Sequence, residues 1–180
     1  MRFTTHLVAA LCAGTMLAAC ATPGLYQARA GEGGYAETRI SDARWHVEFV
    51  GDTVSSPETV ETYLLYRSAE LTLERGYDWF APSAPAMAGE EDIVVSAPRA
   101  EAAPAPVWRP QWRRRSRSRW TDWDPAGPPT PEALPPAPQG VTHYSASADI
   151  VMGRLPAPEG AFNARETLNA LEPSIVRPPS

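Results

Sequence analysis

The chain has 180 residues and a net charge of −5, with 16 arginines and no lysine against 21 acidic residues. This length suits a single domain, and the acidic balance argues against a general nucleic-acid-binding protein. Of the two cysteines, Cys12 falls inside an expected N-terminal signal and Cys20 at its end, which excludes a disulfide framework in the mature chain.

Residues 1–20 have the layout of a bacterial secretory signal, with a charged start, an apolar run and small residues before a cysteine. The apolar run is far shorter than the roughly 20 residues that span a bilayer, so it predicts a cleaved signal. The motif Leu17-Ala18-Ala19-Cys20 resembles the lipobox of bacterial lipoproteins. The resemblance implies a signal peptide over 1–19, cleavage before Cys20 and acyl chains on that cysteine. The alternative is an ordinary cleaved signal with a chance cysteine.

Acylated Cys20 then anchors the protein to a membrane, and no other cofactor is expected. Ala21 follows the cysteine where an inner-membrane retention signal commonly has aspartate, so the periplasmic face of the outer membrane is favoured. We expect residues 20–34, which are rich in glycine, to be a flexible tether between lipid and domain.

The first folded piece, residues 35–82, predicts two strands, a helix and a short third strand. The strands Tyr35–Ile40 and Arg44–Val50 are joined by a tight turn and therefore pair antiparallel. Apolar and polar residues alternate in the second strand, which indicates one buried and one solvated face. Asp78-Trp79-Phe80 begins the third strand. The apolar positions of the second strand are Trp45, Val47 and Phe49.

A long helix is predicted over Pro57–Arg75. Ser56 suits the N-cap, with proline at the first helical position; alternatively, Ser55 and Glu58 form a capping box. Gly76 ends the helix, where a left-handed residue is favoured. The apolar face of the helix comprises Val60, Tyr63, Leu64, Leu65, Ala69, Leu71 and Leu73.

Residues 83–140 predict a long disordered insertion. Of the 20 prolines, 13 lie between Pro82 and Pro138, and this density opposes a continuous helix or central strand. Alanine, proline and arginine offer little apolar surface to offset the entropy of ordering. One short exception is Ile93-Val94-Val95, which predicts a minor strand.

The second folded piece, residues 141–172, predicts a strand and a short helix. Residues Tyr144–Met152 alternate apolar and polar with a period of two, typical of a half-buried strand. Asn163 with Glu166 three residues later predicts a helix N-terminus, and a proline ends that helix before a tail over 173–180. Together the two pieces predict an α+β fold, a small and mostly antiparallel sheet with the long helix packed on one face.

Both pieces resemble a family of small, uncharacterised lipoproteins of Gram-negative bacteria. The resemblance rests on a Gly-Tyr-x-Glu-Thr run at residues 34–38, a Tyr-Leu-Leu-Tyr-Arg-x-Ala-Glu-Leu-Thr run at 63–72 and Gly-Tyr-Asp-Trp-Phe at 76–80. The stretch 144–171 is similar to the end of the same family, whereas the insertion is not. The resemblance implies an envelope lipoprotein of unknown function with no catalytic residues.

The 63–72 run contains an arginine and a glutamate, Arg67 and Glu70, three residues apart on one side of the long helix. Glu74 follows on the same side. A recognition or catalytic pair is one interpretation, and we favour a structural ion pair that ties the helix to the sheet.

The insertion carries the unusual chemistry of the chain. Residues 108–123 hold four of the six tryptophans and six arginines, and residues 99–119 have a net charge of +6. Guanidinium groups pair with phosphate or carboxylate, and indoles favour a membrane interface. We therefore expect binding to anionic lipid, lipopolysaccharide or another acidic envelope polymer; a linker without a partner is the alternative. The candidate residues are Trp108, Trp112, Arg113, Arg114, Arg115, Arg117, Arg119 and Trp120.

Catalysis and metal binding are not expected. His46 and His143 are the histidines outside the signal, and neither has a cysteine to join it in a metal site. No Gly-x-Ser-x-Gly elbow or glycine-rich phosphate loop is present. The sequence predicts a membrane-anchored envelope lipoprotein, a non-catalytic binding or structural module with no nucleic-acid partner. If the signal assignment is wrong, the alternative is a nucleic-acid-binding protein rich in arginine, tryptophan and serine.

Overall fold

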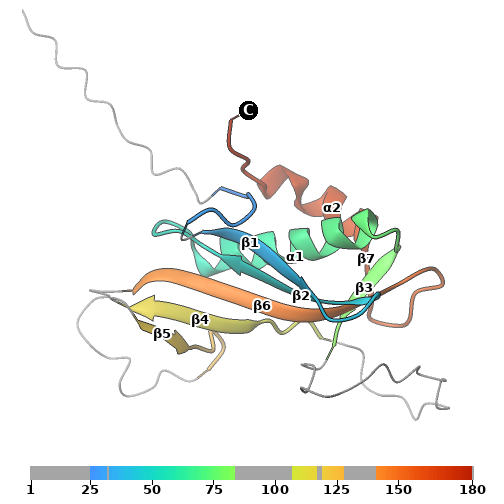
Figure 1. Cartoon of the computed structure of the whole chain (residues 1–180), viewed down its shortest axis with the longest axis horizontal. Helices are drawn as coiled ribbons and strands as arrows, with labels where there is room; N and C mark the ends of the chain where they lie inside the picture. Colours follow the sequence, from blue (N-terminus) through green and yellow to red (C-terminus); the bar gives the residue numbers. More distant parts are fainter. Residues whose placement is uncertain (1–24, 32, 84–106, 117–118, 128–140, 180) are drawn as a thin grey trace, which may run out of the picture.

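The structure is a computed structural model that describes residues 25–31, 33–83, 107–116, 119–127 and 141–179. These residues form an α+β fold, which confirms the predicted class. Helix α1 (Pro57–Glu74) runs along one face of a mostly antiparallel sheet, and the short helix α2 (Ala164–Leu171) packs beside α1 (Figure 1). A 3₁₀ turn, Glu172–Ser174, follows α2.

Strand β6 is the centre of the sheet, which has seven strands in the described part of the chain. One edge of β6 pairs with β2, and β1 lies beyond β2. The other edge is shared, because β3 pairs with the C-terminal half of β6 and β4 with its N-terminal half. The strands are β1 (Gly34–Arg39), β2 (Arg44–Val50), β3 (Trp79–Pro82), β4 (Gln111–Ser116), β5 (Arg119–Asp122), β6 (Val141–Gly153) and β7 (Phe162–Asn163).

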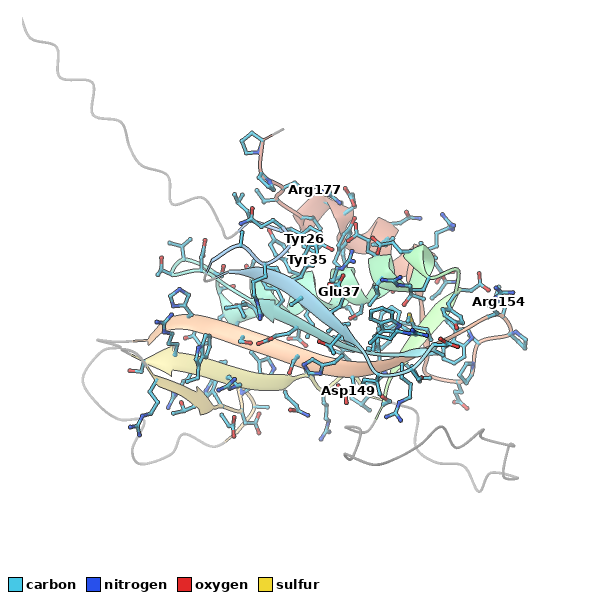
Figure 2. The ribbon with its side chains drawn as sticks, in the orientation of Figure 1. Tyr26, Tyr35, Glu37, Asp149, Arg154 and Arg177 are labelled. Atoms are coloured by element: carbon cyan, nitrogen blue, oxygen red, sulfur yellow. The ribbon has the colours of Figure 1, made fainter. Side chains whose placement is uncertain are left out.

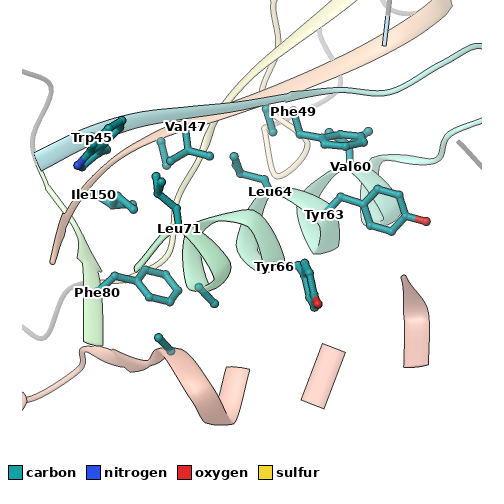
Figure 3. Close-up of a cluster of buried hydrophobic side chains, with 14 of the residues drawn as sticks. Trp45, Val47, Phe49, Val60, Tyr63, Leu64, Tyr66, Leu71, Phe80 and Ile150 are labelled. Carbon is teal, nitrogen blue, oxygen red and sulfur yellow. The ribbon is translucent and has the colours of Figure 1, made fainter. Parts of the chain in front are cut away.

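The core lies between α1 and the face of the sheet that we call the inner face. The alternation in β2 places Trp45, Val47 and Phe49 on this face, where they meet apolar side chains of α1 (Figure 3). Alternate residues of β6, including Ile150, continue the same layer. The predicted burial pattern of both strands is therefore confirmed. The opposite, outer face carries the polar residues of the same strands.

Both ends of α1 follow from local hydrogen bonds. The Ser56 hydroxyl oxygen accepts from the backbone N–H of Thr59 at 3.2 Å, so Ser56 is the N-cap and the alternative capping box is not formed. Ser55 instead donates its hydroxyl to Asp52 at 2.8 Å. At the other end Gly76 has φ +79°, and the N–H of Tyr77 donates back to the carbonyl of Thr72 at 3.0 Å. The chain can therefore leave the helix directly into β3.

Two strands lie within the predicted disordered insertion, and for residues 107–116 and 119–127 that prediction is wrong. β4 pairs with β6 over Gln111–Ser116, and β5 pairs with β4. The N-terminal half of β6 extends beyond β3, so its backbone groups offer an open edge to a further strand. The prolines near β4 flank that strand rather than interrupt it. The minor strand predicted at 93–95 lies outside the described residues.

The predicted flexible tether is also corrected, because residues 25–31 dock on the domain. The Tyr26 side chain is only 5% exposed and belongs to the core. The backbone of Ala28 forms a parallel bridge with Tyr35, and the N–H of Arg29 donates to the Tyr35 carbonyl at 2.8 Å. Gly34 permits this approach, since a Cβ there would lie 2.6 Å from the Gln27 carbonyl oxygen.

The predicted tail is fixed too, at least through Arg177. The carbonyl of Val176 accepts from the N–H of Tyr26 at 2.7 Å, and its own N–H donates to the Tyr63 hydroxyl at 3.0 Å. The N-terminal segment 25–31 and the segment that follows α2 are thus held together beside α1 (Figure 1). The sequence gives no local signal for this contact, because it depends on how the ends meet in space.

Candidate functional site

The β4–β5 hairpin contains most of the residues of the predicted arginine and tryptophan site. Trp112 pairs with Ala146 of β6 and therefore points to the inner face, where it is 8% exposed. Arg113 and Arg115, on either side of inward-pointing Arg114, take the alternate direction and lie on the outer face. Arg119 is exposed at the start of β5, and Arg117 lies outside the described residues.

Three tryptophans of this segment, Trp108, Trp112 and Trp123, pack against aromatic side chains of the domain. Trp112 meets Trp123 edge to face at 5.7 Å, and Trp123 lies 5.1 Å from the ring of Tyr144. Trp108 packs against Phe80 at 6.3 Å between ring centroids. These rings join the sheet to the hairpin, and the open groove beside them has a volume of about 960 Å³.

Trp120 differs from the other three because it lies on the outer face, opposite Arg115 in the β4–β5 pairing. Its ring is 6.5 Å from that of His143, and the Arg113 guanidinium lies 5.7 Å from its centroid. His143 and Ser145 are both buried although they point away from α1. His143 and Ser145 therefore lie beneath other side chains on this part of the outer face.

A pocket of about 370 Å³ lies on this part of the outer face, and we call it the outer-face pocket. Arg29, from the docked N-terminal segment, forms an ion pair with Glu48 at 3.0 Å. The Ser145 hydroxyl donates to the same carboxylate at 2.9 Å. The pocket is lined by Arg29, Gly31, Glu48, Val50, Arg113, Arg115, Trp120 and Ser145.

Arg67 and Glu70, the predicted ion pair, are the centre of a larger cluster on the inner face. The Arg67 side chain is buried and donates to Glu70 at 2.5 Å and to Glu74 at 3.0 Å. It also donates to Glu37 of β1 at 3.0 Å, so the cluster ties the helix to the sheet. The guanidinium lies over the ring of Tyr35, 4.5 Å from its centroid.

The surroundings of this cluster shift the pKa values of its members. Burial alone lowers the pKa of Arg67, but hydrogen bonds to Glu74 and Glu70 outweigh it and raise that pKa above its ordinary value. Tyr26 donates its hydroxyl to Glu70, and burial together with this bond raises the pKa of Tyr26. Burial also raises the pKa of Tyr35. The charged arginine and the neutral phenols are therefore strongly favoured, which suits a permanent structural role.

A second cluster holds the C-terminal segment in place. The Tyr66 hydroxyl donates to Glu172, and Arg177 donates to Glu172 at 2.7 Å and to Tyr66 at 2.7 Å. Burial, then the bond to Glu172, raises the pKa of Tyr66 to about 12. Hydrogen bonds from Arg177 and Tyr66 lower the pKa of Glu172. Arg177 lies directly above Tyr26 (Figure 2), so this cluster is continuous with the first.

His46 and Asp149 form a pair on the outer face. The His46 Nδ1 atom lies 2.6 Å from Asp149 Oδ1, and the two residues are direct cross-strand neighbours. Asp149 is labelled on this face in Figure 2. No group of three or more potential metal ligands occurs among the described residues.

Sequence reasoning missed several residues of these sites. Tyr26 and Arg29 lie in a stretch that reads as a tether because of its glycines. Glu48 and Asp149 are polar positions of recognised strands, but only the pairing of β2 with β6 brings them to their partners. Arg177 lies beyond a proline-terminated helix, and no local pattern indicates its contacts.

The expected lipid anchor, Cys20 with Leu17, Ala18 and Ala19, lies outside the described residues. Within the part that the structure describes, no helix has both the length and the apolar character to cross a membrane. Comparisons with protein-family models, with curated proteins and with solved structures found no match to this chain.

Proposed function

We propose that this protein is a lipid-anchored module of the bacterial cell envelope, and that its folded domain binds a ligand rather than catalyses a reaction. The observation that carries the proposal is the motif Leu17-Ala18-Ala19-Cys20 behind a short apolar run. Burial of each methylene contributes about 0.8 kcal/mol, so two or more acyl chains on Cys20 give stable anchoring. The residue after the cysteine, Ala21, favours the outer membrane.

The docked N-terminal segment supports a role close to the membrane. Tyr26 is part of the core, and only residues 21–25 separate it from Cys20. A fully extended chain covers at most about 3.6 Å per residue, so Tyr26 lies within roughly 22 Å of an acylated Cys20. The domain is thereby kept at the membrane surface, and its partner must come to that surface.

The distribution of charge supports an anionic partner. Arg113, Arg115 and Arg119 are concentrated on one hairpin, whereas the remainder of the mature chain is acidic. Such a local excess attracts anions over a Debye length of about 8 Å at physiological salt. Anionic lipid, lipopolysaccharide and other acidic polymers supply this chemistry in the envelope. We do not expect a nucleic-acid partner at this location.

Metabolic labelling with palmitate, followed by separation of the membranes, tests the anchor. The wild-type protein should carry label and sediment with the outer membrane. Cys20→Ser should lose the label and leave the membrane fraction, whereas Cys12→Ser, the matched change at the other cysteine, should retain both properties. Label on the Cys20→Ser protein, or none on the wild type, would disprove lipid anchoring at this cysteine.

A further inference from the structure

We propose that the molecule has a second binding site, for a carboxylate group, where the turn between β1 and β2 meets the C-terminal end of α1. A pocket of about 330 Å³ lies there, and we call it the turn pocket. It contains no residue of the basic hairpin, so the inference goes beyond the function proposed above and depends on neither the hairpin nor the lipid. The pocket is lined by Arg39, Asp42, Trp45, Arg75 and Tyr77.

Regular structure fixes the residues of the turn pocket. Arg39 at the end of β1 is directly opposite Trp45 of β2, so both side chains leave the sheet on its inner face. Arg75 is the C-cap of α1, the helix that covers this face. The hydroxyl oxygen of Tyr77 lies 3.5 Å from the carbonyl oxygen of Asp42, across the pocket. Two strands and a helix end therefore converge here, and all of them belong to the described range 33–83.

The indole N–H of Trp45 is a donor without an acceptor. Trp45 is only 7% exposed, and its Nε1 atom is shielded from water and has no hydrogen-bond partner. Trp45 lies at the end of the row of core side chains that β2 contributes, which is the end beside the turn pocket (Figure 3). A buried donor that lacks an acceptor is costly, so an acceptor that enters this pocket gains by pairing with it.

The guanidinium of Arg75 is a charge without a counter-ion. Its Cζ atom lies over the ring of Trp45, 4.3 Å from the centroid, and Arg75 forms no ion pair within the described part of the chain. Its neighbour in the chain, Glu74, and the acid of the lining, Asp42, both pair with other arginines. The Arg75 side chain is exposed and can therefore shift as a ligand enters.

A carboxylate answers both groups at once. It has two acceptor oxygens, so one can accept from the Arg75 guanidinium and the other from the indole N–H that lies beneath it. Arg75 is the one charge of the lining that no described residue compensates, and this favours a singly charged anion over a phosphate dianion. Arg39 can join when it exchanges Asp42, because the Asp42 side chain is 85% exposed and such pairs contribute little.

Nuclear magnetic resonance of the indole N–H groups tests the proposal directly. The acylated, full-length mature protein is labelled with ¹⁵N in its six tryptophans and held in detergent micelles, and Trp45→Phe assigns the signal of Trp45. N-acetylalanine should move that signal downfield as the N–H donates to the carboxylate, whereas N-acetylalaninamide, which has the same shape without the charge, should not. An unmoved signal, or an equal shift with the amide, would overturn the proposal. Tighter binding of inorganic phosphate than of N-acetylalanine would also contradict it.

Matched variants locate the site. Arg75→Gln should weaken the binding of N-acetylalanine about tenfold. Arg119→Gln, at an exposed arginine of β5, should leave it unchanged. If Arg119→Gln alone weakens binding, the carboxylate belongs to the hairpin; that result would refute the turn pocket and leave the proposed function standing.

A further variant should bind more tightly than the wild type. Asp42→Asn removes the acid that competes for Arg39, and we expect the affinity for N-acetylalanine to rise about threefold. Arg75 and Asp42 are both at the surface, so these variants keep the test open if Trp45→Phe does not fold. Weaker binding by Asp42→Asn would contradict the arrangement.

Glucuronate distinguishes the source of the carboxylate. It carries the same single charge as N-acetylalanine, but on a sugar in place of a peptide unit. Tighter binding of N-acetylalanine would assign the site to the end of a peptide chain, and tighter binding of glucuronate to a sugar acid. Both results support a carboxylate site, and binding of neither compound would overturn it.

Discussion

Arg67 links helix α1 to the sheet through ion pairs with residues of both. Its guanidinium compensates carboxylates from two elements, Glu70 and Glu74 of α1 and Glu37 of β1. The spacing of three residues predicts the bond to Glu70 from the sequence. The bond to Glu37 is not predictable in this way, because it depends on which face of α1 meets β1.

Replacement of Arg67 should destabilise the fold strongly. Arg67→Met leaves the carboxylates of Glu37 and Glu70 without their buried counter-charge, and we expect a loss of about 3–5 kcal/mol in the free energy of unfolding. Glu74 is half exposed, so Glu74→Gln should cost about 1 kcal/mol or less. Urea denaturation measures both. Losses of similar size would mean that burial of the cluster does not determine its contribution.

Stability should also fall in alkali because of Tyr66. Its pKa is about 12 in the folded state, above the ordinary tyrosine value of about 10, so the unfolded chain loses this proton first. The stabilisation is complete below about pH 10 and is lost as the pH rises toward 12. Tyr66→Phe should reduce the slope of unfolding free energy against pH in that window, with the remainder from Tyr26 and Tyr35. An unchanged slope would contradict the shift.

At the scale of elements, the sheet and α1 follow from local patterns, whereas the hairpin does not. The period of two in β2 and β6 and the capping residues of α1 predict these elements closely. β4 is rich in arginine and lies among prolines, so its composition opposes a strand. It forms because β6 has an open edge and Trp112 finds apolar partners, and both conditions are non-local.

The hairpin should therefore contribute to stability. Trp112→Ala removes a buried ring from the contact with Trp123, and we expect a loss of about 3–5 kcal/mol. Trp120→Ala is the matched change on the neighbouring strand, where the ring is half buried, and it should cost clearly less. Guanidinium denaturation provides the comparison. A Trp112→Ala loss no greater than that of Trp120→Ala would favour an insertion that does not belong to the core.

Docking of the N-terminal segment should depend on Gly34. Gly34→Ala places a Cβ 2.6 Å from the Gln27 carbonyl oxygen at a φ of +110°, so the segment must move away. Gly76→Ala is a control with φ +79° and open space around the new Cβ, and it should show the backbone cost alone, about 1 kcal/mol. Limited proteolysis near residues 25–31 should accelerate in Gly34→Ala and not in Gly76→Ala. Equal protection in both variants would show that the close approach is not needed.

At the scale of the whole molecule, the docked N-terminal segment links the expected lipid anchor to the folded domain. The segment behind the expected anchor is fixed to the core by Tyr26, and the same segment supplies Arg29 to the outer-face pocket. An acylated Cys20 would therefore hold that pocket close to a membrane. Under the proposed function, the anchor would keep the folded domain within the reach of the few residues between Cys20 and Tyr26, roughly 22 Å.

The intact mass of the protein extracted from its own outer membrane tests this account most directly. We predict a chain that begins at Cys20 and carries the added mass of acyl groups, with fragmentation that places them on that residue. An unmodified chain, or one that retains residues 1–19, would contradict the account.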